Sequence, residues 1–223
     1  MNNQTRYSER LHSITLTLST IICSTGLFFG GLLIFVVIIN KRFHTIANLL
    51  TCNSSLCTMF YLIGILIQNV YGLLDDWLYY QPACVFRAYF QMMCCPLVTF
   101  SYLIQAISRL FFTVFYARKN LHTFRIHHFM IILNWCISIV VSCIGYLLDN
   151  HAAILVLNCR YCLVTPEAFK PSIFGIIVAF LIPYSLIIMI YTIIFIYVRQ
   201  SKRRINPQSM SYTNNKTNIV SPN

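Results

Sequence analysis

The sequence predicts an all-α, multi-pass membrane protein. Of its 223 residues, 58% are hydrophobic and only 9% are charged, a balance that a water-soluble domain of this size could not easily cover with polar surface. Runs that lack Asp, Glu, Lys and Arg are long enough to cross a hydrocarbon core of about 30 Å as helices. These runs cover residues 11–40, 43–74, 88–108, 129–148 and 171–198. They lack the alternating segments of roughly ten residues that are typical of a membrane β-barrel.

The elements follow in chain order from these runs. The first run comes after Arg6 and Arg10, as in a signal peptide, but it is about twice as long as a typical signal-peptide core, so we expect a retained span. The predicted spans cover about 12–40, 46–73, 84–113, 128–148 and 171–199. One transmembrane domain (11–204) therefore follows an N-terminal tail (1–10). The polar residues 205–223 are expected to form a disordered tail.

The basic residues orient the chain across the membrane. With the N-terminus outside, the inner side receives Lys41, Arg42, Arg109, Arg118, Lys119, Arg125, Arg199, Lys202, Arg203, Arg204 and Lys216. The outer side then receives all five acidic residues, Glu9, Asp75, Asp76, Asp149 and Glu167. Because basic loops stay in the cytoplasm, this bias predicts an extracellular N-terminus and a cytoplasmic C-terminus.

The net charge of +11 has two interpretations in this arrangement, neither of which involves nucleic acid. A basic inner rim is attracted to anionic lipid of the cytoplasmic leaflet. It can also serve as a docking surface for an intracellular partner. Both interpretations stay open.

No group of residues predicts an enzyme, a cofactor or a metal centre. The sequence has no HExxH and no Gly-rich phosphate loop, and the spans hold no paired carboxylates for acid–base chemistry. His127 and His128, at the inner start of the fourth span, favour an interfacial pair over a metal site. The run Met-Met-Cys-Cys at 92–95 favours packing within a helix over a copper site.

The ten cysteines divide by location. Those within spans are Cys23, Cys52, Cys57, Cys94, Cys95, Cys136 and Cys143. Cys84, Cys159 and Cys162 fall on the predicted outer side, where a disulfide is permitted. We prefer a bridge from Cys84 to Cys162, and the alternative with Cys159 stays open. Asn3-Gln4-Thr5 is an N-glycosylation candidate on the outer tail, whereas Asn215-Lys216-Thr217 lies on the inner side.

Several spacings together resemble the rhodopsin-like (class A) G protein-coupled receptors. Trp77 lies seven residues before Cys84, as the tryptophan of the first outer loop does in that family. Arg109 lies 25 residues after Cys84, the family's interval between the third-span cysteine and the arginine of its Asp-Arg-Tyr motif. Trp135 matches the tryptophan of the fourth span. The resemblance covers nearly the whole chain and implies a receptor in the plasma membrane.

The second and fifth spans extend this resemblance. Asn48 matches the asparagine that opens the family's second span, and Pro183 and Tyr191 match the fifth-span proline and the tyrosine eight residues later. The resemblance implies coupling to a heterotrimeric G protein through Arg109, which approaches Tyr191. Ser108 stands where the family has the aspartate of its motif, so the adjacent carboxylate is missing.

Other departures bear on the ligand. Gln91 replaces the aspartate with which aminergic receptors bind an amine, so the resemblance implies another polar ligand, for example a peptide. Gln91, Met92 and Cys95 are the candidate pocket residues. Thr58 and Gly31 stand where the family carries an aspartate and an asparagine, which argues against its sodium and water network.

The chain stops after its fifth predicted span, although the family has seven. We therefore expect a fragment or a truncated form of a receptor. One alternative is a regulatory form that associates with another, full-length receptor chain. Another is a transporter or channel subunit in which Pro96 and Pro183 mark broken helices, but the predicted spans contain no Asp, Glu or Lys that could bind an ion or a proton.

Overall fold

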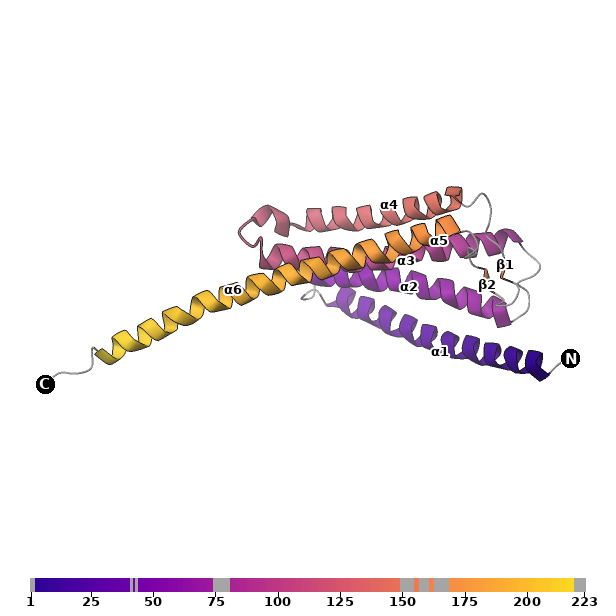
Figure 1. Cartoon of the computed structure of the whole chain (residues 1–223), viewed down its shortest axis with the longest axis horizontal. Coiled ribbons are helices and arrows are strands. Elements are labelled where there is room, and N and C mark those ends of the chain that lie inside the picture. The colour runs from indigo at the N-terminus through magenta and orange to yellow at the C-terminus, as the bar shows by residue number, and fades with distance from the viewer. Residues whose placement is uncertain are drawn as a thin grey trace.

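The computed structural model of the chain describes residues 3–40, 42, 44–73, 81–148, 155–156, 161–162 and 169–218. Its long helices are α1 (Asn3–Ile39), α2 (Ile46–Leu73), α3 (Gln81–Thr113), α4 (Phe124–Leu148), α5 (Phe169–Ile176) and α6 (Ile182–Asn218). The shorter elements are η3 (Lys119–His122), β1 (Leu155–Val156), β2 (Tyr161–Cys162) and η4 (Ile177–Leu181). Figure 1 shows the long helices side by side in one elongated bundle.

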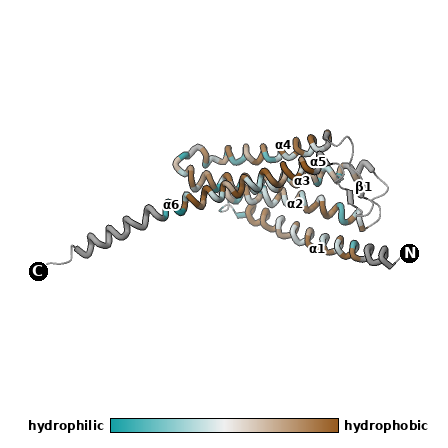
Figure 2. The backbone as a smooth tube through the Cα atoms, in the orientation of Figure 1, coloured by the Kyte–Doolittle hydropathy of each residue, from teal (hydrophilic) through white to brown (hydrophobic). Residues whose placement is uncertain are grey.

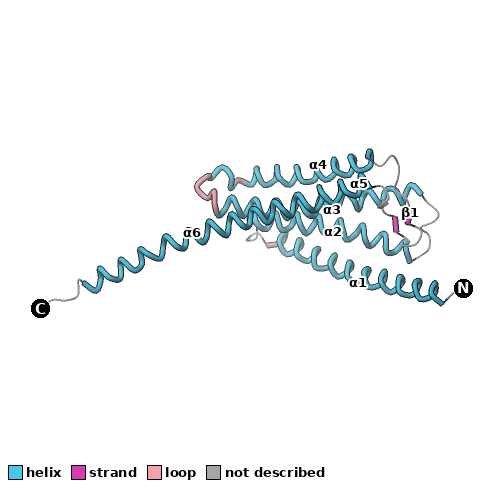
Figure 3. Tube along the Cα trace, in the orientation of Figure 1, coloured by secondary structure: helices cyan, strands magenta, loops and turns pink. Residues whose placement is uncertain are grey.

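The expected fold class is confirmed. Within the described residues, five helical segments are long and apolar enough to cross a membrane. They are Leu11–Ile39, Ile46–Leu73, Phe86–Thr113, Phe124–Gly145 and Ile173–Lys202. Figure 2 shows the predominantly hydrophobic residues along these segments, and Figure 3 shows the short loop and η3 that join α3 to α4.

The fifth span is one continuous rod made of three segments. α5 leads through the π-helical η4 into α6, and the N–H of Ile182 donates to the carbonyl oxygen of Ile177, five residues back. Pro183 follows at once and is fully buried. Proline has no N–H and its ring clashes with the carbonyl of the preceding turn, so a widened turn before it relieves the conflict.

α6 continues beyond the bundle as far as Asn218 (Figure 1). This differs from the expectation of a disordered tail from residue 205, since residues 205–218 are helical. α1 likewise begins at Asn3, within the expected N-terminal tail. Hydropathy locates the apolar part of a helix, but each further residue adds a backbone hydrogen bond, so a helix can extend into polar sequence.

Small residues bring α1 close to α2. A Cβ atom on Gly26 would lie 2.8 Å from Cδ1 of Leu62, and one on Gly30 would lie 3.0 Å from Cγ of Met59. The hydroxyl of Ser55 donates to the carbonyl oxygen of Gly30 at 3.2 Å. Close backbone approach and polar contacts of this kind hold membrane helices together, because the lipid is as apolar as the side chains.

α3 lies at the centre of the bundle and contacts α2, α4 and α6. In its most apolar stretch 44% of the residues are buried, compared with 6% for α1. Two of its buried hydroxyls bond to their own helix: Thr99 to the carbonyl of Pro96 at 3.1 Å and Ser101 to that of Val98 at 2.7 Å. These hydrogen bonds satisfy the two hydroxyls, so the residues can lie in the interior of the bundle.

α3 defines the two ends of the bundle. Cys84 is near its start and Arg109 near its end, about 37 Å apart at 1.5 Å per residue. We call these the Cys84 end and the Arg109 end. The antiparallel pair β1–β2 lies at the Cys84 end, where β2 contacts α2 and α3.

Cys84 is buried and disulfide-bonded. The seven cysteines expected within spans are all free thiols. Cys162 belongs to β2, but its side chain, like the whole of Cys159, lies outside the described part of the chain. The Cys84–Cys162 pairing therefore stays a prediction.

Candidate functional site

Arg109 and Tyr191 form a polar contact between α3 and α6 at the Arg109 end. Nη1 of Arg109 donates to the hydroxyl oxygen of Tyr191 at 2.8 Å. The guanidinium carbon lies 5.9 Å from the centroid of the Tyr191 ring. Both side chains are exposed at the surface of the described chain. The sequence singled out these two residues, and the structure brings them together.

Apolar packing between the same helices positions this contact. Next to it lies a buried apolar cluster formed by Leu103, Ala106 and Ile190. Partly buried side chains that pack against the cluster are Phe100, Ile107, Leu110, Ile187 and Ile194. These residues recur at helical spacing, so one face of α3 meets one face of α6. Arg109 comes after the cluster residues of α3, so its guanidinium lies at the end of the bundle.

Ser108, the neighbour of Arg109, faces α4 instead. Its hydroxyl lies 3.1 Å from Nε2 of His127, and both side chains are buried. Nδ1 of His127 lies 3.0 Å from the carbonyl oxygen of Thr123. A carbonyl only accepts, so Nδ1 carries the hydrogen, and Nε2 accepts from the Ser108 hydroxyl. The neighbouring Ser108 and Arg109 thus join α3 to two different helices.

His127 is packed as well as hydrogen-bonded. Its ring stacks on that of Phe112 with centroids 6.1 Å apart, and His122 of η3 approaches the same phenylalanine at 4.6 Å. His128 is exposed, with Nδ1 2.9 Å from the carbonyl of Phe124. No group of three or more His, Cys, Asp or Glu side chains that could hold a metal ion occurs among the described residues.

Trp135 ties α4 to α2. Its indole N–H donates to the side-chain oxygen of Asn53 at 3.3 Å, and its ring meets that of Phe60 edge-on with centroids 5.5 Å apart. Sequence reasoning identified Trp135 but missed Asn53. Asn48 lies in the first turn of α2, where its backbone N–H donates to the hydroxyl of Thr45 at 3.3 Å. That bond is a helix cap.

The candidate pocket residues divide between two interfaces. Oε1 of Gln91 lies against Gly64 of α2 and is buried without a hydrogen-bond partner among the described residues. Met92 instead packs against Gly145 of α4. Cys95 is a half-buried free thiol. The structure therefore places Gln91 on the α2 side of α3 and Met92 on the α4 side, so they do not line a common surface.

Sequence reasoning also missed a charged residue at the Cys84 end. Arg87 of α3 is buried, and its guanidinium carbon lies 4.1 Å from the centroid of the Tyr71 ring in α2. A cation over an aromatic face is stabilised by the ring quadrupole. The available signal was an arginine three residues after Cys84, just before the charge-free run that begins at residue 88.

Three other predicted residues lie outside the described side chains. Trp77 falls within residues 74–80, and the side chains of Cys162 and Asn3 are not among those described. The expected Trp77 position, disulfide partner and glycosylation site therefore stay predictions.

Comparison with known proteins gives a family match. A model of the family "7 transmembrane receptor (rhodopsin family)" matches residues 30–221, which is most of the chain. No curated protein matches the chain. The expected resemblance to this family is confirmed. Because the family match spans far more than half of its residues, the chain belongs to the rhodopsin family of seven-transmembrane receptors.

Proposed function

We propose that this chain senses an extracellular ligand and transmits the signal to a heterotrimeric G protein at the Arg109 end. The observation that carries the proposal is the hydrogen bond between Arg109 and Tyr191 at the end of α3. In this proposal the Arg109 end is cytoplasmic and the N-terminus is outside, in agreement with the basic inner loops. An arginine there can reach water or phosphate rather than hydrocarbon, so its cost is modest.

The hydrogen-bond partners of residues 108 and 109 suggest which conformational state of the bundle such a receptor would favour. Ser108 hydrogen-bonds His127 on one side of α3, and Arg109 hydrogen-bonds Tyr191 on the other side. An aspartate at 108 would compete with Tyr191 for the guanidinium. We propose that the serine shifts the population of bundle states towards the one in which Arg109 contacts α6.

The ligand in this proposal binds near the Cys84 end. Arg87 and Gln91 offer cationic and amide groups along α3, and Tyr61 adds a hydroxyl from α2. These groups support a polar ligand, for example a peptide, that presents carboxylate or carbonyl oxygens. The disulfide at Cys84 would hold the outer loop close to that ligand.

Binding to a purified G protein tests the proposal without knowledge of the ligand. The chain is inserted in lipid nanodiscs, and its affinity for a nucleotide-free heterotrimer is compared with that of Arg109→Ala. Arg118→Ala is the matched control, since it removes one exposed positive charge in the loop after α3. We expect at least a tenfold loss for Arg109→Ala, about 1.4 kcal/mol, and little change for Arg118→Ala. Equal binding by all three chains would overturn the coupling role.

A further inference from the structure

The loop between α1 and α2 presents a hydroxyl directly before α2. Thr45 precedes Ile46, the first residue of α2, and its side chain is exposed. The hydroxyl oxygen accepts the backbone N–H of Asn48 at 3.3 Å, and the carbonyl oxygen of Thr45 accepts that of Leu49 at 2.9 Å. Thr45 therefore caps α2 from an exposed position.

Basic residues precede this hydroxyl. Lys41 and Arg42 stand four and three positions before Thr45, in the run Lys-Arg-Phe-His-Thr. Basophilic serine/threonine kinases recognise an arginine three positions before the acceptor, because carboxylates beside their active site bind its guanidinium. Arg42 and His44 are exposed, like Thr45. Both the acceptor and the arginine are therefore accessible to such an enzyme.

The same spacing occurs at one other hydroxyl of the sequence, Ser13, which follows Arg10 by three positions. Ser13 lies inside α1, where its carbonyl oxygen accepts the hydroxyl of Thr17 at 2.8 Å. A helical residue reaches the cleft of a kinase only after local unfolding of the helix. His44 and Thr45 belong to no helix. The structure thus favours Thr45 over Ser13 as an acceptor.

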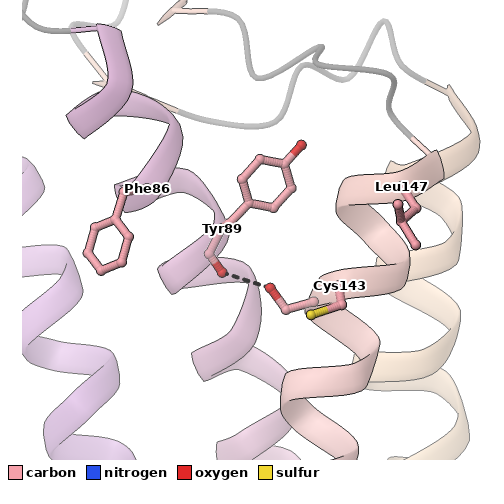
Figure 4. A pocket seen from close by; sticks show the side chains of 5 residues that line it. Phe86, Tyr89, Cys143 and Leu147 are labelled. Carbon is pink, nitrogen blue, oxygen red and sulfur yellow. Dashed lines mark hydrogen bonds between the residues drawn. The ribbon is translucent and has the colours of Figure 1, made fainter.

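Contacts of α3 show at which end of the bundle this loop lies. At the Cys84 end, Ser142 of α4 donates to the carbonyl oxygen of Tyr89 at 3.1 Å, beside a cavity of about 460 Å³ (Figure 4). At the Arg109 end, Nε2 of Gln105 donates to the carbonyl oxygen of Leu50 at 3.4 Å. Leu50 is in the second turn of α2, so the loop before α2 lies at the Arg109 end.

We propose that Thr45 is a site of phosphorylation by a basophilic serine/threonine kinase. The Thr45 hydroxyl oxygen attacks the γ-phosphorus of ATP, the bond from that phosphorus to the bridging oxygen breaks, and ADP leaves. The hydroxyl proton passes to the catalytic aspartate of the kinase. The site rests on the cytoplasmic orientation of the Arg109 end proposed above, because ATP and these kinases are inside the cell. It does not depend on G protein coupling.

The phosphate would strengthen the start of α2. It adds a charge of roughly −2 and acceptor oxygens beside the N–H groups of the first turn, where the helix dipole favours an anion. It also places negative charge at an end of the bundle where Arg42, Arg118 and Arg125 are exposed. We expect slower hydrogen exchange of the amides of residues 46–49 in the phosphorylated chain.

Phosphorylation of the full chain in lipid nanodiscs tests the proposal. Both faces of a nanodisc are open to the enzyme, so a negative result is distinct from a failure of the proposed orientation or of G protein coupling. The probe is calcium/calmodulin-dependent kinase with magnesium ATP, and mass spectrometry maps the phosphopeptides. We expect phosphate on Thr45, at a rate that Arg42→Gln lowers about tenfold or more through loss of a charge-assisted contact. Arg118→Gln changes an exposed arginine of another loop and should leave the rate unchanged.

Alanine variants of the two hydroxyls form a matched pair for the same assay. Thr45→Ala should abolish the phosphate, Thr45→Ser should retain it, and Ser13→Ala should have no effect. Size-exclusion profiles and helical circular dichroism verify that the variants are folded. If Thr45→Ala does not fold, the phosphopeptide map of the unaltered chain and the rate of Arg42→Gln still decide.

Two outcomes would overturn the Thr45 site. The first is an unaltered chain without phosphate on Thr45, whether it stays unmodified or carries phosphate on Thr123 or Ser201, which also have basic neighbours. The second is phosphate on Thr45 at equal rates in the unaltered chain and in Arg42→Gln, which would show that the basic residues before it do not direct the enzyme.

Discussion

Arg109 of α3 and Tyr191 of α6 are joined by a hydrogen bond of 2.8 Å between the guanidinium and the phenol. The residues are 82 positions apart in the chain, so the contact records how α3 and α6 pack. It lies next to a buried apolar cluster of the same two helices. A rotation of either helix would separate the two groups, which makes their contact a sensitive measure of the bundle's state.

Tyr191→Phe removes this hydrogen bond and keeps the ring. Because both side chains are exposed, we expect a loss of about 1 kcal/mol or less in the free energy of unfolding. Thermal unfolding in nanodiscs measures the change. Tyr197→Phe is the control, since Tyr197 is equally exposed and lies on the same helix. A larger loss for Tyr197→Phe than for Tyr191→Phe would contradict the assigned contact.

Ser108→Ala should destabilise the chain more than the loss of a single hydroxyl group suggests. The change leaves the buried Nε2 of His127 without its donor, which costs about 1–3 kcal/mol. Ser101→Ala is the matched control, because the Ser101 hydroxyl bonds only a carbonyl of its own helix. Comparison of the two unfolding temperatures checks the prediction. Equal shifts would show that the bond between α3 and α4 contributes nothing of its own.

Gly64→Ala should disturb the α2–α3 interface. A Cβ at this position would overlap Oε1 of Gln91 and lie 3.3 Å from the Phe90 ring. The Gln91 amide can swing aside, so we expect a cost of about 1 kcal/mol, at the low end of overpacking. Gly31→Ala offers a control, since a Cβ there would lie 4.0 Å from the nearest atom of Met59, an ordinary contact. The control should be neutral or slightly stabilising, because alanine favours helix more than glycine does. If both variants unfold at the wild-type temperature, the close approach of Gln91 is wrong.

Cys84→Ser should remove the disulfide and destabilise the chain by about 2–4 kcal/mol. Cys143→Ser, at a free and exposed thiol, should leave the unfolding temperature unchanged. Peptide mapping of the unreduced chain identifies the partner. We expect a Cys84–Cys162 peptide, and recovery of a Cys84–Cys159 peptide instead would assign the bridge to the other cysteine.

The sequence allows the helices to be located, but not the way they face one another. Hydropathy placed α2 at residues 46–73, the same limits that the structure has, because the length of an apolar run is a property of the run itself. The extension of α6 to Asn218 was not predicted, since polar residues carry no apolar signal for a helix.

The same limit applies to the candidate site. The pairing of Arg109 with Tyr191 could be anticipated from the family's motifs, but the partner of Ser108 could not. The sequence favours an interfacial role for His127 over a metal site and points to no partner for its ring. The ring meets Ser108 because α3 and α4 pack with those faces together. Met92 and Gln91 were both predicted to line one pocket, but packing places Met92 against Gly145 of α4, away from Gln91. Side-chain partners between helices depend on the rotation of each helix, which no single run specifies.

The central claim is that the Arg109 end lies in the cytoplasm, where a G protein can reach it. α6 projects from that end, so a tag after Asn223 reports its side of the membrane, and a tag before Met1 reports the Cys84 end. Antibody staining of expressing cells, with and without permeabilisation, makes the measurement. The account predicts an N-terminal tag that stains in intact cells and a C-terminal tag that stains only after permeabilisation. A C-terminal tag that stains in intact cells would contradict it.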